Sequence, residues 1–144
     1  MENKEKIENF KFNKLEIHPN ATVHPNAQLD DGVSVSQGAI IGPDVVIGSG
    51  TEVGPNSIIE GKTTLGKNNK IYPNVFLGLE PQDLKYDGGD TDLIIGDNNT
   101  FRECVTVNKA TNEGEKTIIG NNNLLMAYSH IGHNCEIGNN VILS

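Results

Sequence analysis

The sequence predicts an all-β fold, a parallel β-helix in which the chain winds through stacked triangular coils. The first observation behind this prediction is a period of six residues. Every sixth residue from Ile17 to Leu143 is Ile, Val, Leu or Phe, apart from Asp83, Gly89 and Glu113. An α-helix has a period of about 3.6 residues and a β-strand a period of about 2, so neither leaves this pattern along a whole chain.

The composition is the second observation. The 144 residues include 16 glycines, no tryptophan and 5% aromatic residues. A compact globule normally buries larger side chains, so we expect a thin, repetitive core of Val, Ile and Leu. The length suits one domain.

The other positions of each six-residue unit supply the third observation. Glycine often follows the aliphatic residue, and a small or β-branched residue stands four positions after it. Asparagine pairs such as Asn68-Asn69 and Asn98-Asn99 recur between units, and Asn and Gly tolerate the left-handed backbone that sharp corners need. We therefore expect one short strand and one turn per unit, and three units per coil. Some seven coils, stacked about 4.8 Å apart, would form a prism about 34 Å tall.

The first sixteen residues do not follow the period. They contain four Lys and four Glu, with Ile7, Phe10 and Phe12 between them. We expect an arm over residues 1–16, as a short helix or a loose segment, and one β-helix domain over residues 17–144.

Two polar interruptions, at about residues 78–92 and 108–117, break the aliphatic series and then return to the same phase. Each is long enough to project from the prism as a loop. Loops on a rigid scaffold often hold functional residues, although a tolerated surface insertion has the same composition. Because the phase is kept, the coils on either side should stay in register.

Charge and cysteine content exclude several classes of protein. The net charge of −8 argues against a nucleic-acid partner, whose binders present basic surfaces. No apolar run approaches the roughly 18 residues of a membrane-spanning helix, and the first sixteen residues do not have the charged-then-apolar pattern expected of a leader sequence. Cys104 and Cys135 are too few for a disulfide framework, so we expect two reduced, packed thiols. We therefore expect a soluble, cytoplasmic protein.

Four histidines are the candidates for chemistry. His18 and His24 each stand in a His-Pro-Asn triplet, which indicates a corner of the coil. His130 and His133 lie about two coils beyond the first loop, and could be surface residues, a general base or metal ligands. A zinc site needs three or four ligands, so we predict no metal. A histidine base is physically reasonable near neutral pH. No Ser-His-Asp arrangement is visible, so we expect direct attack by an acceptor.

Four segments together resemble one family of enzymes. They are Gln82–Tyr86, Arg102–Val107, Asn123–Met126 and His130–His133. In this order and spacing, the chain from Ile17 onward is similar to the hexapeptide-repeat acyltransferases, and in particular to the acyl-[acyl-carrier-protein]–UDP-N-acetylglucosamine O-acyltransferases. The resemblance implies a left-handed parallel β-helix and a homotrimer with active sites between neighbouring prisms. It also implies the first step of lipid A biosynthesis.

The reaction that the resemblance implies transfers a (3R)-3-hydroxyacyl group to the glucosamine 3-hydroxyl of UDP-N-acetylglucosamine. The donor is carried on the phosphopantetheine of acyl carrier protein, and no other cofactor is implied. A related UDP-sugar N-acyltransferase of the same fold, or a non-catalytic solenoid, is an alternative. The acyl carrier protein is acidic, so Arg102, Lys109 and Lys116 are candidates for a local basic docking patch.

The resemblance also assigns roles to individual residues. His133 falls on the general base, and His130 on a position that helps to place substrate. Asp83 and Gln82 fall on the loop that contacts the sugar. Lys85 suits the acceptor or its phosphates, unless it is an ordinary surface lysine.

Two positions depart from the family pattern. Asn134 stands where many members have Asp, and it can hold the base by a hydrogen bond without offsetting an imidazolium charge. Asn108 stands where the family has His.

The chain also stops at Ser144, one residue into a new unit, so we expect the N-terminal part of a longer protein. The oxyanion-hole amide and the acyl-chain ruler would lie beyond it, and this part alone should be nearly inactive.

Overall fold

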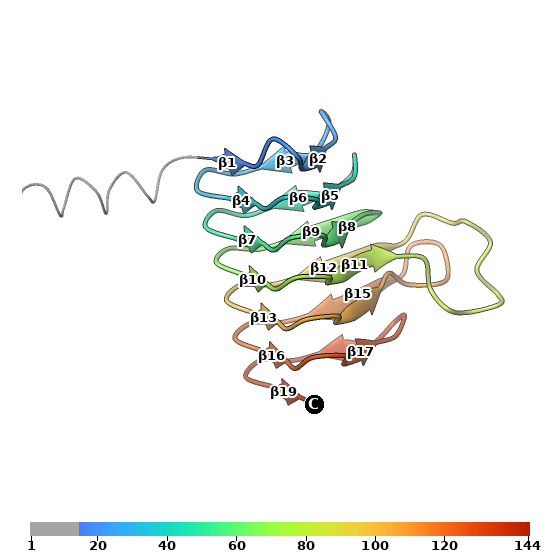
Figure 1. Cartoon of the computed structure of the whole chain (residues 1–144). Coiled ribbons are helices and arrows are strands. Elements are labelled where there is room, and N and C mark those ends of the chain that lie inside the picture. Colours follow the sequence, from blue (N-terminus) through green and yellow to red (C-terminus); the bar gives the residue numbers. More distant parts are fainter. Residues whose placement is uncertain (1–14) are drawn as a thin grey trace, which may run out of the picture.

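A computed structural model describes residues 15–144, and in this range the regular elements are all short β-strands that pair in parallel (Figure 1). The chain visits three sheets in turn, one strand in each, before it starts the next coil. The predicted all-β, six-residue winding is confirmed. Residues 1–14 of the expected arm lie outside the described residues, and Glu16 is in the first strand.

The three sheets form the three faces of the prism. The first sheet contains β1 (Glu16–Ile17), β4 (Ser34–Val35), β7 (Glu52–Val53), β10 (Lys70–Ile71), β13 (Thr100–Phe101), β16 (Leu124–Leu125) and β19 (Ile142–Leu143). The second contains β2 (Thr22–Val23), β5 (Ile40–Ile41), β8 (Ile58–Ile59), β11 (Phe76–Leu79), β14 (Thr106–Asn108) and β17 (His130–Ile131). The third contains β3 (Gln28–Leu29), β6 (Val46–Ile47), β9 (Lys62–Leu65), β12 (Asp92–Ile95), β15 (Lys116–Ile119) and β18 (Glu136–Ile137).

The aliphatic residue of each unit points into the prism and stacks on its equivalent in the next coil. In the first sheet, Val53 pairs with Ile71, Ile71 with Phe101, and Phe101 with Leu125. These four side chains are at most 2% exposed. Parallel in-register strands place identical slots above one another, so each coil buries its apolar side chains against its neighbours.

The corners use the left-handed backbone that the asparagine pairs predict. Asn68, Asn98 and Asn140 all have positive φ angles, between 54° and 58°. Cys104 and Tyr128 also have positive φ, at 62° and 64°. The sequence did not predict these two, because neither residue favours that region.

A ladder of buried polar side chains runs along one inner corner, next to the first sheet. Its members are Thr51, Asn69, Asn99 and Asn123, each at most 3% exposed. Each side chain accepts a hydrogen bond from the backbone N–H of a residue in the next coil and donates one to a glycine carbonyl. The ladder thus pairs backbone groups that would otherwise be buried without partners.

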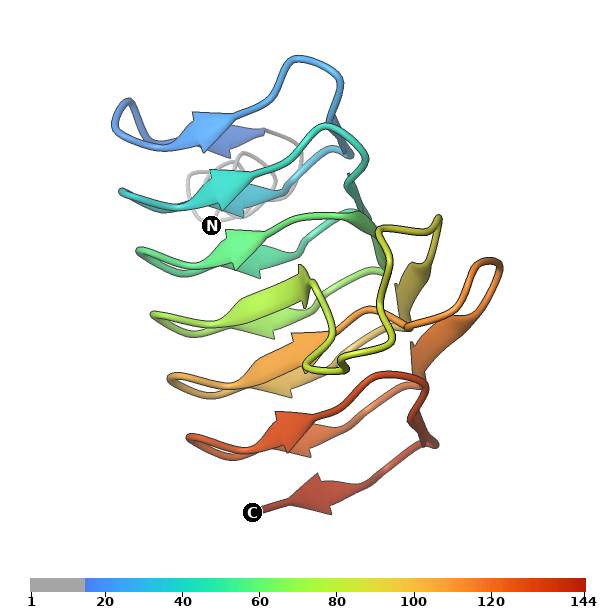
Figure 2. The ribbon, with the colours of Figure 1, turned by 90° about the vertical axis from the view of Figure 1, so that its right-hand side faces the viewer.

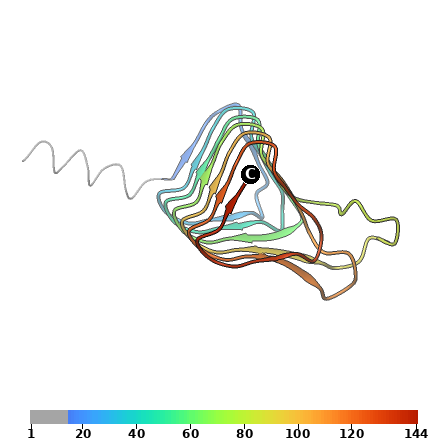
Figure 3. The same cartoon turned by 90° about the horizontal axis from the view of Figure 1, so that it is seen from below.

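Both long interruptions leave the prism at the corner between the second and third sheets. β11 ends at Leu79 and β12 begins at Asp92, whereas β14 ends at Asn108 and β15 begins at Lys116. Seen from below, the two loops extend from the same side of the triangular outline (Figure 3), and Figure 2 shows them in successive coils. Ile95 still pairs with Leu65 and with Ile119, so the register is kept on both sides.

The described residues include no helix with the length and hydropathy needed to cross a bilayer.

Candidate active site

His133 lies in the turn between β17 and β18, at the same corner as the two loops but in the next coil. Three consecutive coils therefore present the first loop (80–91), the second loop (109–115) and the His133 turn at one edge of the prism. The two loops are joined to each other: the backbone N–H of Gly114 donates to the carbonyl of Asp90 at 2.9 Å. The Lys109 ammonium lies 5.2 Å from the centre of the Tyr86 ring.

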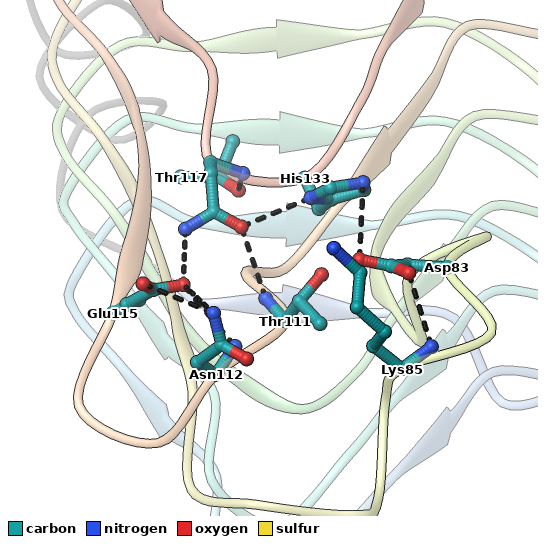
Figure 4. A network of polar contacts seen from close by, with 8 residues as sticks. Asp83, Lys85, Thr111, Asn112, Glu115, Thr117 and His133 are labelled. Carbon is teal, nitrogen blue, oxygen red and sulfur yellow. Dashed lines mark hydrogen bonds and ion pairs between the residues drawn. The ribbon is translucent and has the colours of Figure 1, made fainter.

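The first loop brings Asp83 to His133. The Nε2 atom of the imidazole is 3.6 Å from a carboxylate oxygen of Asp83, which is longer than a hydrogen bond. The Asp83 side chain is 13% exposed and that of His133 is 37% exposed. The imidazole thus faces a shielded carboxylate on one side and solvent on the other (Figure 4).

Asp83 is held in place by its own loop. Its Oδ1 atom accepts a hydrogen bond of 3.0 Å from the backbone N–H of Lys85. This bond lowers the pKa of the Asp83 carboxyl below its ordinary value, and the charges of Lys85 and of a protonated His133 act in the same direction, against partial burial. Asp83 is therefore ionised near neutral pH. Figure 4 shows the Lys85 side chain turned toward Asp83 and His133.

A second group of contacts holds the other side of the imidazole. The Nδ1 atom of His133 lies 3.0 Å from Oδ1 of Asn134. The same oxygen accepts a hydrogen bond of 3.1 Å from the backbone N–H of Thr111. Asn134 itself has a φ of 62°, and its backbone N–H donates to the buried hydroxyl of Thr117 at 2.9 Å. The predicted hydrogen bond between the ring and Asn134 is therefore present in the structure, with the Asn134 oxygen as acceptor.

Glu115 completes this group from the second loop. Its carboxylate accepts a hydrogen bond from the Asn134 side-chain amide and others, at 3.2 Å, from the backbone and side-chain N–H groups of Asn112. The bonds from Asn112, then that from Asn134, lower the pKa of Glu115 below its ordinary value, while partial burial opposes them. Glu115 is thus connected through Asn134 to His133, and Figure 4 shows Glu115 and His133 at the two ends of this chain of contacts.

The other predicted site residues lie beside this cluster. His130 is exposed on β17, and its Nδ1 atom is 2.7 Å from the hydroxyl of Thr106 on the neighbouring strand. Its Nε2 atom lies near Gly132, the residue before His133: a Cβ at Gly132 would be 3.8 Å from it. Gln82 is exposed on the first loop next to Asp83. The structure thus places His133 and Asp83 face to face with Lys85 turned toward them, whereas His130 is three residues before His133 on β17 and Gln82 precedes Asp83 in the first loop.

Glu115, Asn112 and Thr111 are site residues that sequence reasoning missed. They could have been identified from the stacking of the coils. The second loop and the His133 turn occupy the same corner of successive coils, so residues at the end of that loop lie one coil from His133. Three buried polar atoms without a hydrogen-bond partner also lie where the loops join the prism: the Thr91 and Thr111 hydroxyls and the Asn108 side-chain oxygen. Buried polar atoms are usually paired, and of these three the Thr111 hydroxyl lies close enough to Asp83 to help lower the pKa of that carboxyl.

The remaining candidates lie outside the cluster. The ring nitrogens Nδ1 of His18 and His24 accept hydrogen bonds of 3.1 Å from backbone N–H groups two residues later, which is the predicted corner role. Cys104 and Cys135 are both free, but Cys104 is only half-buried and Cys135 is exposed, so the expectation that both thiols are packed is wrong. Within residues 15–144, no three or more His, Cys, Asp or Glu side chains are grouped to hold a metal ion.

Acid should loosen the second loop before it affects the prism. Because the pKa of Glu115 is lowered in the folded protein, its ionised form stabilises the fold above the ordinary titration range of glutamate, near pH 4.3. That stabilisation is lost as pH falls through the lower folded value. We expect the hydrogen-exchange protection of the Asn112 amide, corrected for intrinsic rates, to fall there, while that of the Tyr72 amide in the prism persists.

The variant Glu115→Gln is the control for this experiment, because it removes the titrating carboxyl and leaves that of Asp83. The acid-dependent loss of protection at Asn112 should then disappear. If wild-type protection at Asn112 stays constant through this range, the carboxylate does not hold the loop.

Comparison with known proteins supports the family resemblance. The model of the bacterial transferase hexapeptide family (six repeats) matches residues 44–78 and 116–144. The acyl-[acyl-carrier-protein]–UDP-N-acetylglucosamine O-acyltransferase of Thermodesulfovibrio yellowstonii is 45% identical over 130 residues, which is 90% of this chain and 50% of the relative. The enzyme with the same name from Saccharophagus degradans is 49% identical over 129 residues, covering 88% and 50%.

Solved structures agree. A crystal structure of a UDP-N-acetylglucosamine acyltransferase has a TM-score of 0.87 at 42% identity and covers 90% of this chain and 50% of that one. The UDP-N-acetylglucosamine acyltransferase from Campylobacter jejuni has a TM-score of 0.83 at 37% identity, covering 88% and 50%. The chain spans about half the length of the curated relatives it matches. These matches confirm the left-handed parallel β-helix. The chain belongs to the hexapeptide-repeat family of bacterial transferases, and over about nine-tenths of its length it is a homologue of the acyl-[acyl-carrier-protein]–UDP-N-acetylglucosamine O-acyltransferases.

Proposed function

We propose that this chain provides the general-base side of an acyltransferase active site. The reaction moves a (3R)-3-hydroxyacyl group from acyl carrier protein to the glucosamine 3-hydroxyl of UDP-N-acetylglucosamine, as the first step of lipid A biosynthesis. The observation that supports it best is the environment of the His133 imidazole. Its Nδ1 atom contacts the Asn134 side chain, and its Nε2 atom faces Asp83 and solvent without a hydrogen bond.

In the proposed mechanism, the 3-hydroxyl of the acceptor donates its proton to Nε2 of His133 as its oxygen attacks the thioester carbonyl. The new C–O bond forms, the C–S bond breaks, and the proton passes from Nε2 to the departing thiolate of phosphopantetheine. Histidine is suited to both transfers because its protonation changes near neutral pH. No residue of the chain becomes acylated.

The first loop has the groups needed to position the sugar nucleotide. Asp83 is ionised and can accept a hydrogen bond from a second sugar hydroxyl. Lys85 is turned toward the same space and suits a phosphate, and Gln82 is exposed beside them. His130 is hydrogen-bonded to Thr106 on the neighbouring strand, and in this proposal it orients the acceptor.

A homotrimer is part of this proposal. Leu84, in the middle of the projecting first loop, is fully exposed. A large apolar side chain on a protruding loop is suited to burial against a neighbouring subunit. Such packing would close the open side of the His133 cluster. The reaction belongs in the cytoplasm, where the acyl carrier protein and nucleotide sugars are available.

The docking of acyl carrier protein does not rest on the three cations chosen from the sequence. Arg102 forms an ion pair of 3.2 Å with Glu103 and lies 4.5 Å from the centre of the Tyr72 ring. Lys109 is on the second loop, and Lys116 is on β15. Lys109 and Lys116 stand at the two ends of the second loop, whereas Arg102 is in the turn after β13 and is paired with Glu103, so the proposal does not extend to a docking patch.

Assay of the intact protein with UDP-N-acetylglucosamine and with its 3-amino analogue tests the proposal. We expect acyl transfer from a 3-hydroxyacyl carrier protein to the hydroxyl acceptor, and poorer transfer to the amine. A preference for the amine would instead identify a related N-acyltransferase. Activity with neither acceptor would support a non-catalytic solenoid.

A further inference from the structure

The Asn134 side chain is held in one orientation by two groups that cannot exchange roles. The Thr111 backbone N–H can only donate, so the amide oxygen must face it. The Glu115 carboxylate is ionised and can only accept, so the amide nitrogen must face that side. Reversing the amide would break both contacts at once.

This fixed orientation determines which imidazole nitrogen is protonated. The Asn134 oxygen that faces Thr111 is also the atom 3.0 Å from Nδ1 of His133. An amide oxygen only accepts, so Nδ1 must be the N–H donor. In the neutral ring, Nε2 then has the free lone pair on the side of Asp83 and solvent. This tautomer is the one that a base acting through Nε2 requires.

Glu115 also adds a negative charge behind the ring. It is anchored by Asn112 at 3.2 Å, so its position does not depend on His133. From the other side, His133 faces Asp83, with Lys85 beside it. The group in contact with Nδ1 is a neutral amide, and a carboxylate lies behind it.

We propose that Glu115 is a positioning residue that acts through Asn134: it fixes the amide so that His133 keeps its proton on Nδ1, and it stabilises the imidazolium that forms during catalysis. The catalytic consequence rests on the proposed function, whereas the tautomer does not. During the reaction the proton moves only between the acceptor hydroxyl, Nε2 and the thiolate. Nδ1 and Asn134 keep their protons, and Glu115 stays ionised.

Long-range ¹H–¹⁵N NMR of the intact protein tests the structural part without substrate. In the wild type we expect the His133 signals of the Nδ1–H tautomer. Glu115→Gln retains a carbonyl that can accept from Asn134, so this tautomer should persist. Glu115→Ala removes one of the two contacts that fix the amide, so the Nε2–H tautomer should become more populated than in the wild type. A wild-type ring protonated on Nε2, or a tautomer ratio unchanged in Glu115→Ala, would overturn the proposal.

A double-mutant cycle tests the charge. Asn134→Asp places a second carboxylate against Glu115, and the repulsion should lower kcat by about tenfold, less than removal of the base itself. Adding Glu115→Gln removes the repulsion and supplies a donor to the new carboxylate, so the double variant should recover most of the loss. If it recovers none, Glu115 does not act through position 134.

The two parts can fail separately. If the tautomer responds to Glu115 as expected but no acyl transfer is found, the proposed reaction is wrong and the positioning role stands. If acyl transfer occurs and the tautomer is insensitive to Glu115→Ala, the reaction stands and the positioning role is wrong.

Discussion

Replacing His133 with alanine should lower kcat of the intact protein by about 10²-fold or more, the usual contribution of a general base. This corresponds to about 2.7 kcal/mol of lost transition-state stabilisation. The loss should appear mainly in kcat and less in KM, because proton transfer to Nε2 occurs in the transition state. Steady-state kinetics with a 3-hydroxyacyl carrier protein and UDP-N-acetylglucosamine measure both constants.

His24→Ala is the matched control for this variant. His24 is also an exposed imidazole at a corner, but its Nδ1 accepts a hydrogen bond from its own turn and it lies several coils from the loops. Its removal should leave kcat and KM unchanged. Full activity in His133→Ala would exclude the general-base role and favour a scaffold that only binds or assembles.

Replacing Asn99 with alanine should cause the largest loss of stability. The buried side chain of Asn99 donates to the Gly120 carbonyl at 2.9 Å and accepts from the Asn123 backbone N–H at 3.0 Å. Alanine leaves both backbone groups buried without a partner, and each such group costs about 1–3 kcal/mol. We expect a total loss of about 2–4 kcal/mol, measured as a lower midpoint in urea unfolding.

The chain contains its own control for this substitution. Thr51 occupies the equivalent slot of an earlier coil, where its hydroxyl donates to the Gly66 carbonyl at 3.0 Å and accepts from the Asn69 N–H at 3.2 Å. Asn99→Thr can therefore form the same two bonds and should be much less destabilising than Asn99→Ala. Equal losses for the two variants would show that side-chain volume, rather than hydrogen bonding, determines the effect.

The repeat itself was predictable because its physical cause is local and periodic. A coil buries its aliphatic residue only against the same slot of the next coil, so every coil needs the same residue type at that slot. Ile41, Ile59 and Leu77 satisfy this condition in sequence and pair in the second sheet. The corner asparagines follow the same logic, since each left-handed turn needs a residue that tolerates it.

The site was predictable only in part. His133 and Asp83 were identified through the family resemblance, and nothing in their spacing indicates that they lie face to face. Glu115 and Thr111 were not identified at all, because a glutamate in a polar loop is indistinguishable from a solvated one until its partner is known. From the sequence, Asn134 is expected to hold the ring without offsetting an imidazolium charge, and the structure adds a carboxylate behind its amide.

The sequence by itself determined the winding of the chain, because one buried slot in every six residues leaves few other ways to cover the apolar side chains. Only the tertiary structure decided which polar groups surround His133. Both loops and the His133 turn share one corner in three successive coils, and stacking brings residues 18 or more positions apart to within hydrogen-bonding distance, as for Glu115 and Asn134. Contacts of this kind depend on where the chain returns, and the residue types alone do not specify them.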